Sequence, residues 1–374
     1  MNSVYITQAK VITALGPDLE SLYAGLMDQK SGIQPVTRFD TQSYAGPYAG
    51  IIESLEPENE SSLIVQLADM LLEQLGDINK DTFLITASTK AGIDRLDGCN
   101  GRSEAVSKNL LLSSLTGYIA RKTRLKHKGI NINSACASST IAIAKGASLI
   151  ESGSADSVLI CCMDTVSQFV FSGFSCLGAM SDTPARPFDK DRNGLTLGEG
   201  AAAVMLMNRQ KAKELGKPCL AQITGWGIAS DASHLTAPAK DGCGLKLAIK
   251  KTCGKAGIKT DDIHAINTHG TGTVYNDAME INVIHDLFDC NKIVANSIKG
   301  AIGHTLGAAG GIETALCVKM LEKQMMTPTI GFCNPEKGAE TIISQNARAL
   351  MDHRMLTTNS GFGGINAAII LEGG

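Results

Sequence analysis

The chain has 374 residues, 44% of them hydrophobic, and a formal net charge of −3 at pH 7. This length predicts two or three domains or one large two-lobed unit with an ample core. The near-neutral charge argues against nucleic acid as a partner, and no apolar run is long enough to span a membrane. With 11 cysteines but no export signal and no CxxC pair, we expect reduced thiols, a cytoplasmic location and no metal site.

Hydrophobic periodicity predicts alternating strands and helices in the first half of the chain. The expected strands are 3–13, 82–86, 130–132, 158–162 and 201–207, and the expected helices are 18–28, 61–75 and 141–152. Residues 92–128 show less regular patterning and end in a basic cluster, Arg121 to Lys128. That cluster is either a solvated helix end or a docking patch for an acidic protein.

A turn-rich link over 186–194 leads into the strand at 201–207, and the second half, which begins around Pro218, repeats the alternation. Its expected strands are 220–228, 263–267, 292–296 and 366–371, and its expected helices are 245–256, 277–288 and 306–323. Strands that alternate with helices in both halves indicate a layered α/β architecture.

Cys136 stands where the strand at 130–132 gives way to a helix of small residues. Free backbone N–H groups and the positive end of a helix dipole stabilise a thiolate there, so we expect a lowered thiol pKa. The same N–H groups can hold an oxyanion. A buried cysteine packed among alanines is the alternative interpretation.

Two histidines in the second half follow similar patterns. His269 comes directly after a strand, in Thr-His-Gly-Thr-Gly-Thr, and His304 precedes the small-residue helix. Neutral imidazoles can donate hydrogen bonds to a developing enolate oxygen. Lys299 is expected to balance charge or orient a histidine, and Glu313, inside an apolar helix, needs a partner. Taken singly, each histidine is better explained as an ordinary hydrogen-bonded residue.

Together with the glycine-rich segment 361–364, these motifs resemble the condensing enzymes, the β-ketoacyl–acyl-carrier-protein synthases of the elongating kind. The resemblance runs from about Val11 to the C-terminus. It implies a duplicated thiolase-like fold of five layers, α-β-α-β-α. The half at 1–215 would carry the nucleophilic cysteine, and the half at 216–374 the two histidines and a gating loop.

The resemblance also implies a role for each motif residue. Cys136 would take an acyl group, and His269 and His304 would then drive decarboxylative condensation with a malonyl-carrier protein, extending the chain by two carbons. Lys299 and Glu313 match the family's lysine and supporting glutamate, Thr271 and Thr273 its phosphopantetheine contacts, and Gly361, Phe362 and Gly363 its gating loop. The N–H groups of Cys136 and Phe362 would form the oxyanion hole, and the Phe362 ring would gate the acyl pocket.

No cofactor is implied beyond the phosphopantetheine of an acyl carrier protein, which is the expected partner. A homodimer and a heterodimer with a ketosynthase-like subunit both remain open, as do fatty-acid and polyketide or polyene pathways. Arg186, Lys190 and Arg192 are further candidates for carrier docking. Ser360 stands where the family commonly has phenylalanine, which suggests a roomier or differently gated pocket.

Two other functions compete. A thiolase would need a second cysteine near the C-terminus, and the chain has none after Cys333. A non-catalytic chain-length partner would not need Cys136 and both histidines.

Overall fold

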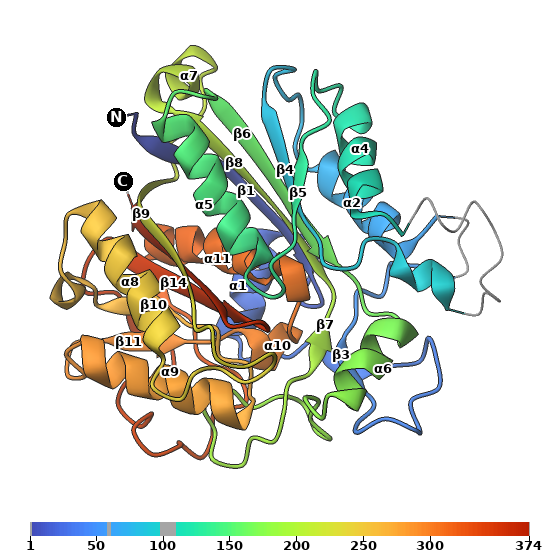
Figure 1. The fold of residues 1–374 in the computed structure, drawn as a ribbon, viewed down its shortest axis with the longest axis vertical. Coiled ribbons are helices and arrows are strands. Elements are labelled where there is room, and N and C mark those ends of the chain that lie inside the picture. Colours follow the sequence, from blue (N-terminus) through green and yellow to red (C-terminus); the bar gives the residue numbers. More distant parts are fainter. Residues whose placement is uncertain (1, 58–60, 98–109, 374) are drawn as a thin grey trace.

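Two sets of five strands form the centre of the computed structural model, which describes residues 2–57, 61–97 and 110–373 (Figure 1). The first set comprises β1 (Val4–Thr13), β4 (Phe83–Ala87), β5 (Ile130–Ile132), β6 (Ser157–Asp164) and β8 (Gly200–Asn208). The second comprises β9 (Ala221–Ser230), β10 (Ala265–Asn267), β11 (Val294–Asn296), β14 (Arg354–Gly361) and β15 (Ile365–Gly373). Short strands β2 (Ile33–Pro35), β3 (Tyr48–Gly50), β7 (Leu197–Gly198), β12 (Met325–Met326) and β13 (Arg348–Ala349) complete the strands.

The two sets share one topology. Across the sheet the order is β5-β4-β6-β8-β1 in the first set and β11-β10-β14-β15-β9 in the second. In each set the edge strand is the third of the five in chain order. Counted inward from that edge, the first two strand pairings are parallel and the last two are antiparallel. Pairing of β1 with β9 joins the sets. The predicted duplication is therefore confirmed in the topology, although no repeat is visible in the residues.

Three hydrophobic clusters define the layers. Helices α1 (Leu19–Met27), α5 (Ser138–Glu151) and α11 (Ala309–Lys323) contribute to a central cluster that draws on both strand sets. Helices α2 (Leu63–Glu73) and α4 (Leu112–Lys122) cover the outer face of the first set, and α8 (Cys243–Ala256) and α9 (Val274–Leu287) that of the second (Figure 1). This arrangement is the five-layered α/β fold that the family resemblance implied.

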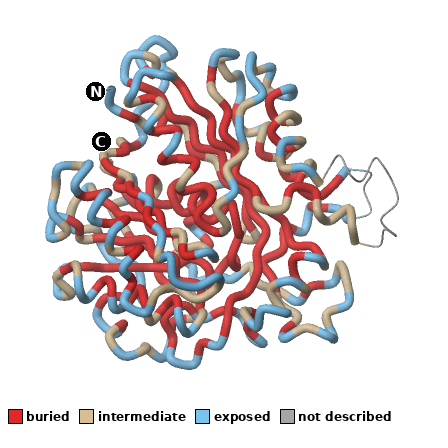
Figure 2. Tube along the Cα trace, viewed as in Figure 1, coloured by how far each residue is buried: buried red, intermediate tan, exposed pale blue. Residues whose placement is uncertain are grey.

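Helix α11 approaches helix α5 and strand β6 closely because it has glycines at the points of contact. A Cβ on Gly310 of α11 would lie 1.9 Å from Thr140 Oγ1, and one on Gly311 would lie 2.1 Å from Cys162 Sγ. Only glycine fits at these positions. Figure 2 shows the resulting buried centre, with both helices coloured as buried along most of their length.

Most predicted elements occur, with ends shifted by a few residues, but three elements of eight or more residues were missed. Helix α4 lies in the irregular stretch 92–128, of which 98–109 falls outside the described residues. Helix α6 (Gln168–Cys176) and strand β14 were also not predicted. The remaining helices are α7 (Arg209–Glu214) and α10 (Lys299–Ile302), with 3-10 turns η1 (Ile93–Leu96), η2 (Thr260–Asp262) and η3 (Leu306–Ala308). The proposed boundary at residue 215 lies between β8 and β9.

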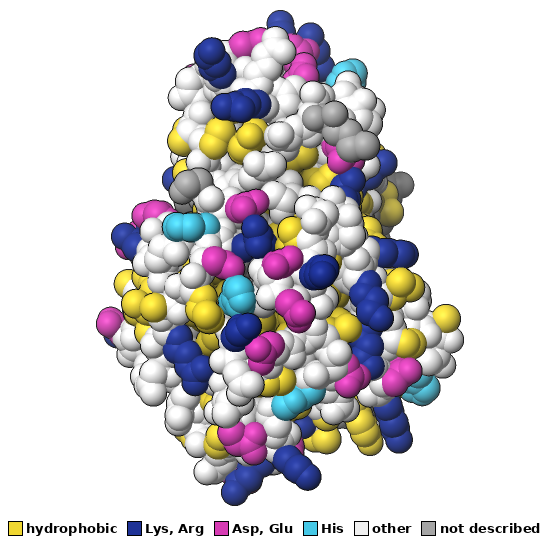
Figure 3. Space-filling view, turned by 90° about the vertical axis from the view of Figure 1, so that its left-hand side faces the viewer, with side chains coloured by type: hydrophobic (Ala, Val, Ile, Leu, Met, Phe, Trp, Pro, Cys, Tyr) yellow, Lys and Arg dark blue, Asp and Glu magenta, His cyan; other side chains and the backbone are white. Residues whose placement is uncertain are grey.

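The surface carries charges of both signs. On the face shown in Figure 3, acidic and basic side chains are interspersed among apolar ones. Among the described helices, none has the length and hydropathy that a bilayer-spanning segment requires.

Candidate active site

Cys136 lies in a tight turn between β5 and α5, two residues before the helix begins. Ala135 adopts a left-handed φ of 49°, which is uncommon for a residue with a Cβ. The Ser138 hydroxyl stabilises the turn, since it accepts from the Ser134 N–H and donates to the Ala135 carbonyl. The turn therefore holds the cysteine at the carboxyl end of the first strand set, as predicted from the small-residue pattern.

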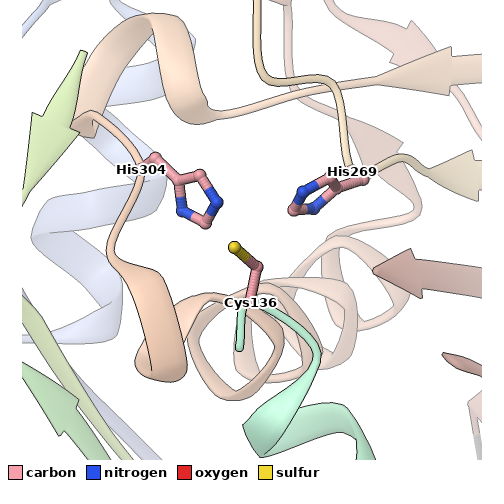
Figure 4. Close-up of side chains that lie close together, drawn as sticks. All are labelled: Cys136, His269 and His304. Atoms are coloured by element: carbon pink, nitrogen blue, oxygen red, sulfur yellow. The ribbon is translucent and has the colours of Figure 1, made fainter. Parts of the chain in front are cut away.

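Both predicted histidines face this cysteine from the second half of the molecule (Figure 4). The Cys136 sulfur and one nitrogen of each histidine lie within 4.8 Å of one another. The two imidazole rings meet edge to face, with centroids 5.2 Å apart. All three residues are buried. Residues 136, 269 and 304, distant in the sequence, thus form one cluster.

The hydrogen bonds of both imidazoles favour the same tautomer. His304 Nδ1 accepts the Leu306 N–H at 3.1 Å, and His269 Nδ1 lies 3.2 Å from Asn359 Nδ2, which can only donate. Each ring proton is then on Nε2. Within the described residues, His304 Nε2 has no partner although it is buried. Two N–H donors are therefore available to a ligand beside the sulfur.

Both imidazoles are neutral near pH 7. Burial holds the pKa of His269 and of His304 well below the usual value, and the positive charge of Lys299 lowers both further. Neutral rings can donate from Nε2 while Nδ1 accepts, as the hydrogen bonds require.

A buried ionic network lies behind His269. The Lys299 ammonium contacts the Glu313 carboxylate and the His269 carbonyl oxygen, and Asn359 Nδ2 donates to Glu313 at 2.7 Å. Asn359 also contacts Thr140 of α5. Removing one member of a buried ion pair typically costs about 3–5 kcal/mol, because the other charge is left uncompensated. Lys299 and Glu313 thus lie together behind His269, and Asn359, which contacts both His269 and Glu313, was not identified from the sequence.

The loop at 269–273 is held by two buried acids of α9. Glu280 accepts from the His269 and Gly270 N–H groups at 2.7 Å each, and Asp277 accepts from the Thr271 N–H at 3.0 Å. Burial and the nearby Asp277 charge raise the pKa of Glu280 to about 7. Sequence reasoning missed both acids, because they occur in an amphipathic segment where acidic residues usually face solvent.

The expected lowering of the Cys136 pKa is wrong. Burial raises the pKa of this thiol to about 11, and the opposing effects of Lys299 and of the Phe362 backbone N–H are smaller. The sulfur is withdrawn from water so completely that desolvation of the thiolate outweighs the helix end. The resting cluster is a neutral thiol beside two neutral imidazoles.

This charge state predicts how Cys136 reacts with iodoacetamide. Because the thiolate is the nucleophile and its fraction grows with pH below the pKa, the alkylation rate should rise about tenfold per pH unit between pH 7 and 9. Peptide-resolved mass spectrometry would follow Cys136, with the exposed Cys219 as an internal reference. A rate that levels off below pH 8 would instead indicate a thiolate–imidazolium pair.

The cluster opens into a cavity of about 350 Å³. Its lining includes Cys136, His269, Thr271, Thr273, His304, Ser360, Gly361 and Phe362. The Thr271 and Thr273 hydroxyls contact each other at 2.9 Å. Gly363 is not part of the lining, and its N–H donates to the Leu235 carbonyl. Of the cysteines in the described ranges, Cys136 alone lines this cavity.

The docking assignment of Arg192 is wrong, because this residue is buried. Its guanidinium pairs with Glu336 at 2.7 Å and lies 3.7 Å from Asp277, so it supports the loop at 269–273. Arg186 and Lys190 are exposed. The basic cluster at 121–128 precedes β5, whereas Cys136 follows it. Since β4, β5 and β6 are parallel, that cluster lies at the opposite end of the strands from the site.

The sequence predicts no metal site because no histidine and cysteine residues have ligand spacing along the chain. The fold nevertheless brings three such residues together. Cys136, His269 and His304 form a three-member set of sulfur and nitrogen donors of the kind that Zn²⁺ favours.

Comparison with known proteins assigns the family. Residues 76–212 match the model described as beta-ketoacyl synthase, N-terminal domain, and residues 220–333 match its C-terminal domain. The chain is 29% identical to the 3-oxoacyl-[acyl-carrier-protein] synthase 2 of Vibrio cholerae, with 99% of this chain and 98% of that protein covered.

Solved structures agree. The ishigamide ketosynthase/chain length factor is 27% identical, with a TM-score of 0.89 and coverage of 100% of this chain and 99% of that one. A ketosynthase in complex with its chain length factor from Xenorhabdus doucetiae is 25% identical, with a TM-score of 0.81 and coverage of 100% and 98%. The chain therefore belongs to the β-ketoacyl synthase family and is an acyltransferase of the 3-oxoacyl-[acyl-carrier-protein] synthase type.

Proposed function

We propose that Cys136 carries the acyl group and that His269 and His304 stabilise the enolate formed when a malonyl thioester loses CO₂. The observation that supports this division is the pair of unprotonated Nδ1 atoms, which leaves both Nε2–H groups free to donate beside the sulfur. Two preorganised donors in a site away from water are the arrangement that stabilises a developing oxyanion.

The first half-reaction forms a thioester on the enzyme. The Cys136 sulfur attacks the acyl carbonyl, the bond to the phosphopantetheine sulfur breaks, and the thiol proton ends on the departing carrier thiol. Because the resting thiol is neutral, the proton leaves the sulfur as the new bond forms. The Lys299 charge and the Phe362 N–H favour the developing negative charge.

The second half-reaction consumes the malonyl group. Its carboxylate leaves as CO₂, and the electron pair of the broken bond becomes the enolate, whose oxygen accepts from His269 and His304. The enolate carbon attacks the acyl carbonyl on Cys136, the carbon–sulfur bond breaks, and the resulting thiolate takes a proton from water. The product is a β-ketoacyl carrier protein two carbons longer.

The Cys136 and Phe362 N–H groups are proposed as the oxyanion hole for the acyl carbonyl. Gly361 lies against this pair, since a Cβ there would be 3.2 Å from the Cys136 nitrogen and 3.1 Å from the Ser134 carbonyl oxygen. A methyl group at this position would crowd the carbonyl oxygen of an incoming thioester.

Gly361→Ala should therefore slow acylation of Cys136 by about a hundredfold, the effect of losing one oxyanion donor. Malonyl decarboxylation should change much less, because the histidine donors are untouched. Acyl loading would be timed by intact-protein mass spectrometry. Gly254→Ala is the matched control, since a Cβ there meets nothing within 4 Å. Equal slowing of both half-reactions would contradict the assignment.

We also propose an acyl carrier protein as the donor and a second ketosynthase-like subunit as the dimer partner. Similar structures include a ketosynthase bound to a chain length factor. In this chain β5 is an edge strand of the sheet, and Phe169 of α6 and its C-cap Leu177 are 51% and 56% exposed. Unpaired edges and exposed aromatic side chains are typical of interfaces. Light scattering of the purified protein, alone and coexpressed with candidate subunits, would identify the assembly.

Ser360 lines the cavity that contains both histidines but not the cavity behind Phe362. Its hydroxyl donates to Asn366 Oδ1 at 2.7 Å, and its side lines the cavity that also contains both histidines. The extra room relative to a phenylalanine is therefore on that side and not behind Phe362. We propose a pathway that handles bulky or stiff chains, as in polyketide or polyene synthesis.

One experiment tests the proposed function as a whole. Purified protein would be incubated with acyl-carrier protein and then with malonyl-carrier protein, with mass spectrometry at each stage. The proposal requires an acyl mass on Cys136 and then its transfer to an extended product. Protein that gains no acyl mass would be a non-catalytic subunit.

A further inference from the structure

A second cavity of about 370 Å³ lies beside the first. The two cavities share Cys136, Phe174, Leu177 and Phe362, so the sulfur and the Phe362 ring lie between them. The rings of Phe174 and Phe362 stack with centroids 5.9 Å apart. Most of the remaining lining is apolar and includes Val170 and Leu306. On the proposed function, this cavity receives the acyl chain attached to Cys136.

Lys90 is a charged residue in a cavity lining that is otherwise mostly apolar. It lines the second cavity and is half-buried, and its positive charge makes only a small contribution to the Cys136 pKa. Throughout the described ranges, no hydrogen bond or ion pair is recorded for its Nζ atom. An ammonium in such a position can donate three hydrogen bonds.

The backbone at Lys90 is fixed by a buried carboxylate. Asp164, at the end of β6, accepts from the Ser88 hydroxyl at 2.8 Å, from the Thr89 N–H at 3.0 Å and from the Thr89 hydroxyl at 2.8 Å. It also accepts from the Gly307 N–H at 2.8 Å, beside the other wall of the cavity. The backbone that precedes Lys90 is therefore held by the same residue that holds Gly307, the neighbour of Leu306.

A plain alkyl chain in this cavity would displace water from the ammonium without replacing its hydrogen bonds, which is unfavourable. A chain with an oxygen atom near Lys90 would satisfy them. The simpler alternative is that the lysine stem only covers apolar surface while its head stays in water. That alternative predicts no discrimination between the two kinds of chain.

We propose that Lys90 is a specificity-determining residue that selects acyl groups bearing a hydrogen-bond-accepting oxygen, such as a carboxylate or a hydroxyl, over plain alkyl chains. This inference rests on the proposed acylation of Cys136. A carboxylate should be favoured most, because a charged acceptor roughly doubles the strength of a hydrogen bond to an ammonium.

The test compares three pantetheine thioesters of equal length: octanoyl, 8-hydroxyoctanoyl and 7-carboxyheptanoyl. Pantetheine replaces the carrier protein, so that docking does not affect the comparison. The rate of mass gain on Cys136 should be about tenfold or more higher for the carboxylate than for the alkyl chain. Lys90→Met, which keeps the length but removes the charge, should reverse this preference, and Lys90→Arg should retain it.

Lys145→Met is the control, since Lys145 is exposed on α5 and is not part of either cavity. Equal rates for the three donors in the unaltered protein would overturn the role of Lys90, as would an unchanged ratio in Lys90→Met. Failure of all three donors to load Cys136 would overturn the proposed function itself. The two failures are therefore distinguishable.

Discussion

Cys136→Ala should abolish acyl loading while leaving malonyl decarboxylation in place. Removing a catalytic nucleophile commonly costs far more than a thousandfold in rate, and chain extension should fall by at least about that factor. The histidine donors keep their tautomers, since the partners of both Nδ1 atoms, Leu306 and Asn359, are independent of the cysteine. The decarboxylating half of the site should therefore survive.

Two measurements follow acyl loading and malonyl decarboxylation separately. Mass spectrometry after incubation with acyl-carrier protein follows loading, and release of labelled CO₂ from malonyl-carrier protein follows decarboxylation. Cys219→Ala is the matched control, because Cys219 is also a free cysteine but is exposed. An acyl mass on the Cys136→Ala protein would mean that another residue is the nucleophile.

Local pattern accounts for most of the fold that could be predicted. Segments with a clear period, such as β1 and α2, were located to within a few residues because burial on one face imposes that period. Strand β14 was missed because it is buried along most of its length and contains Thr357, Thr358 and Asn359, and Thr357 and Asn359 make buried hydrogen bonds to Asn267 and Glu313. Its pattern reflects the site and not one apolar face.

Two residues that position the site were not identified from the sequence. Asn359 of β14 orients His269, and Asp164 at the end of β6 holds the loop that carries Lys90. Each acts through contacts between segments more than 70 residues apart in the sequence. Motif spacing identifies residues that react. It does not identify the buried polar residues that hold them, because any acidic or amide residue in the chain could make those hydrogen bonds.

The two errors at the site have a common cause. Arg192 looked like a docking residue and Cys136 like a residue with a lowered pKa, because both interpretations assumed contact with water. In the structure both are buried. Burial depends on the packing of both halves of the molecule, and a single segment of sequence does not determine it.

His304→Ala should produce the opposite pattern to Cys136→Ala, with acyl loading retained and decarboxylation reduced by about 10²–10³-fold, the usual effect of losing one oxyanion donor. His304 suits this test because, within the described residues, its ring makes one hydrogen bond, which Nδ1 accepts from the Leu306 N–H. His269→Ala should behave similarly but also lose the Asn359 contact, so its melting temperature should fall more.

The pH dependence provides a second readout for the same pair. Burial holds both imidazole pKa values well below 6.5, so both rings are neutral at pH 6.5 and above. Decarboxylation by the unaltered protein should therefore change little between pH 6.5 and 8, whereas a mechanism through an imidazolium would lose activity as pH rises. Loss of acyl loading in His304→Ala would contradict the proposed role of His304, and so would a steep fall of decarboxylation between pH 6.5 and 8. Either result would show that the histidines transfer protons instead of donating hydrogen bonds to the enolate as neutral rings.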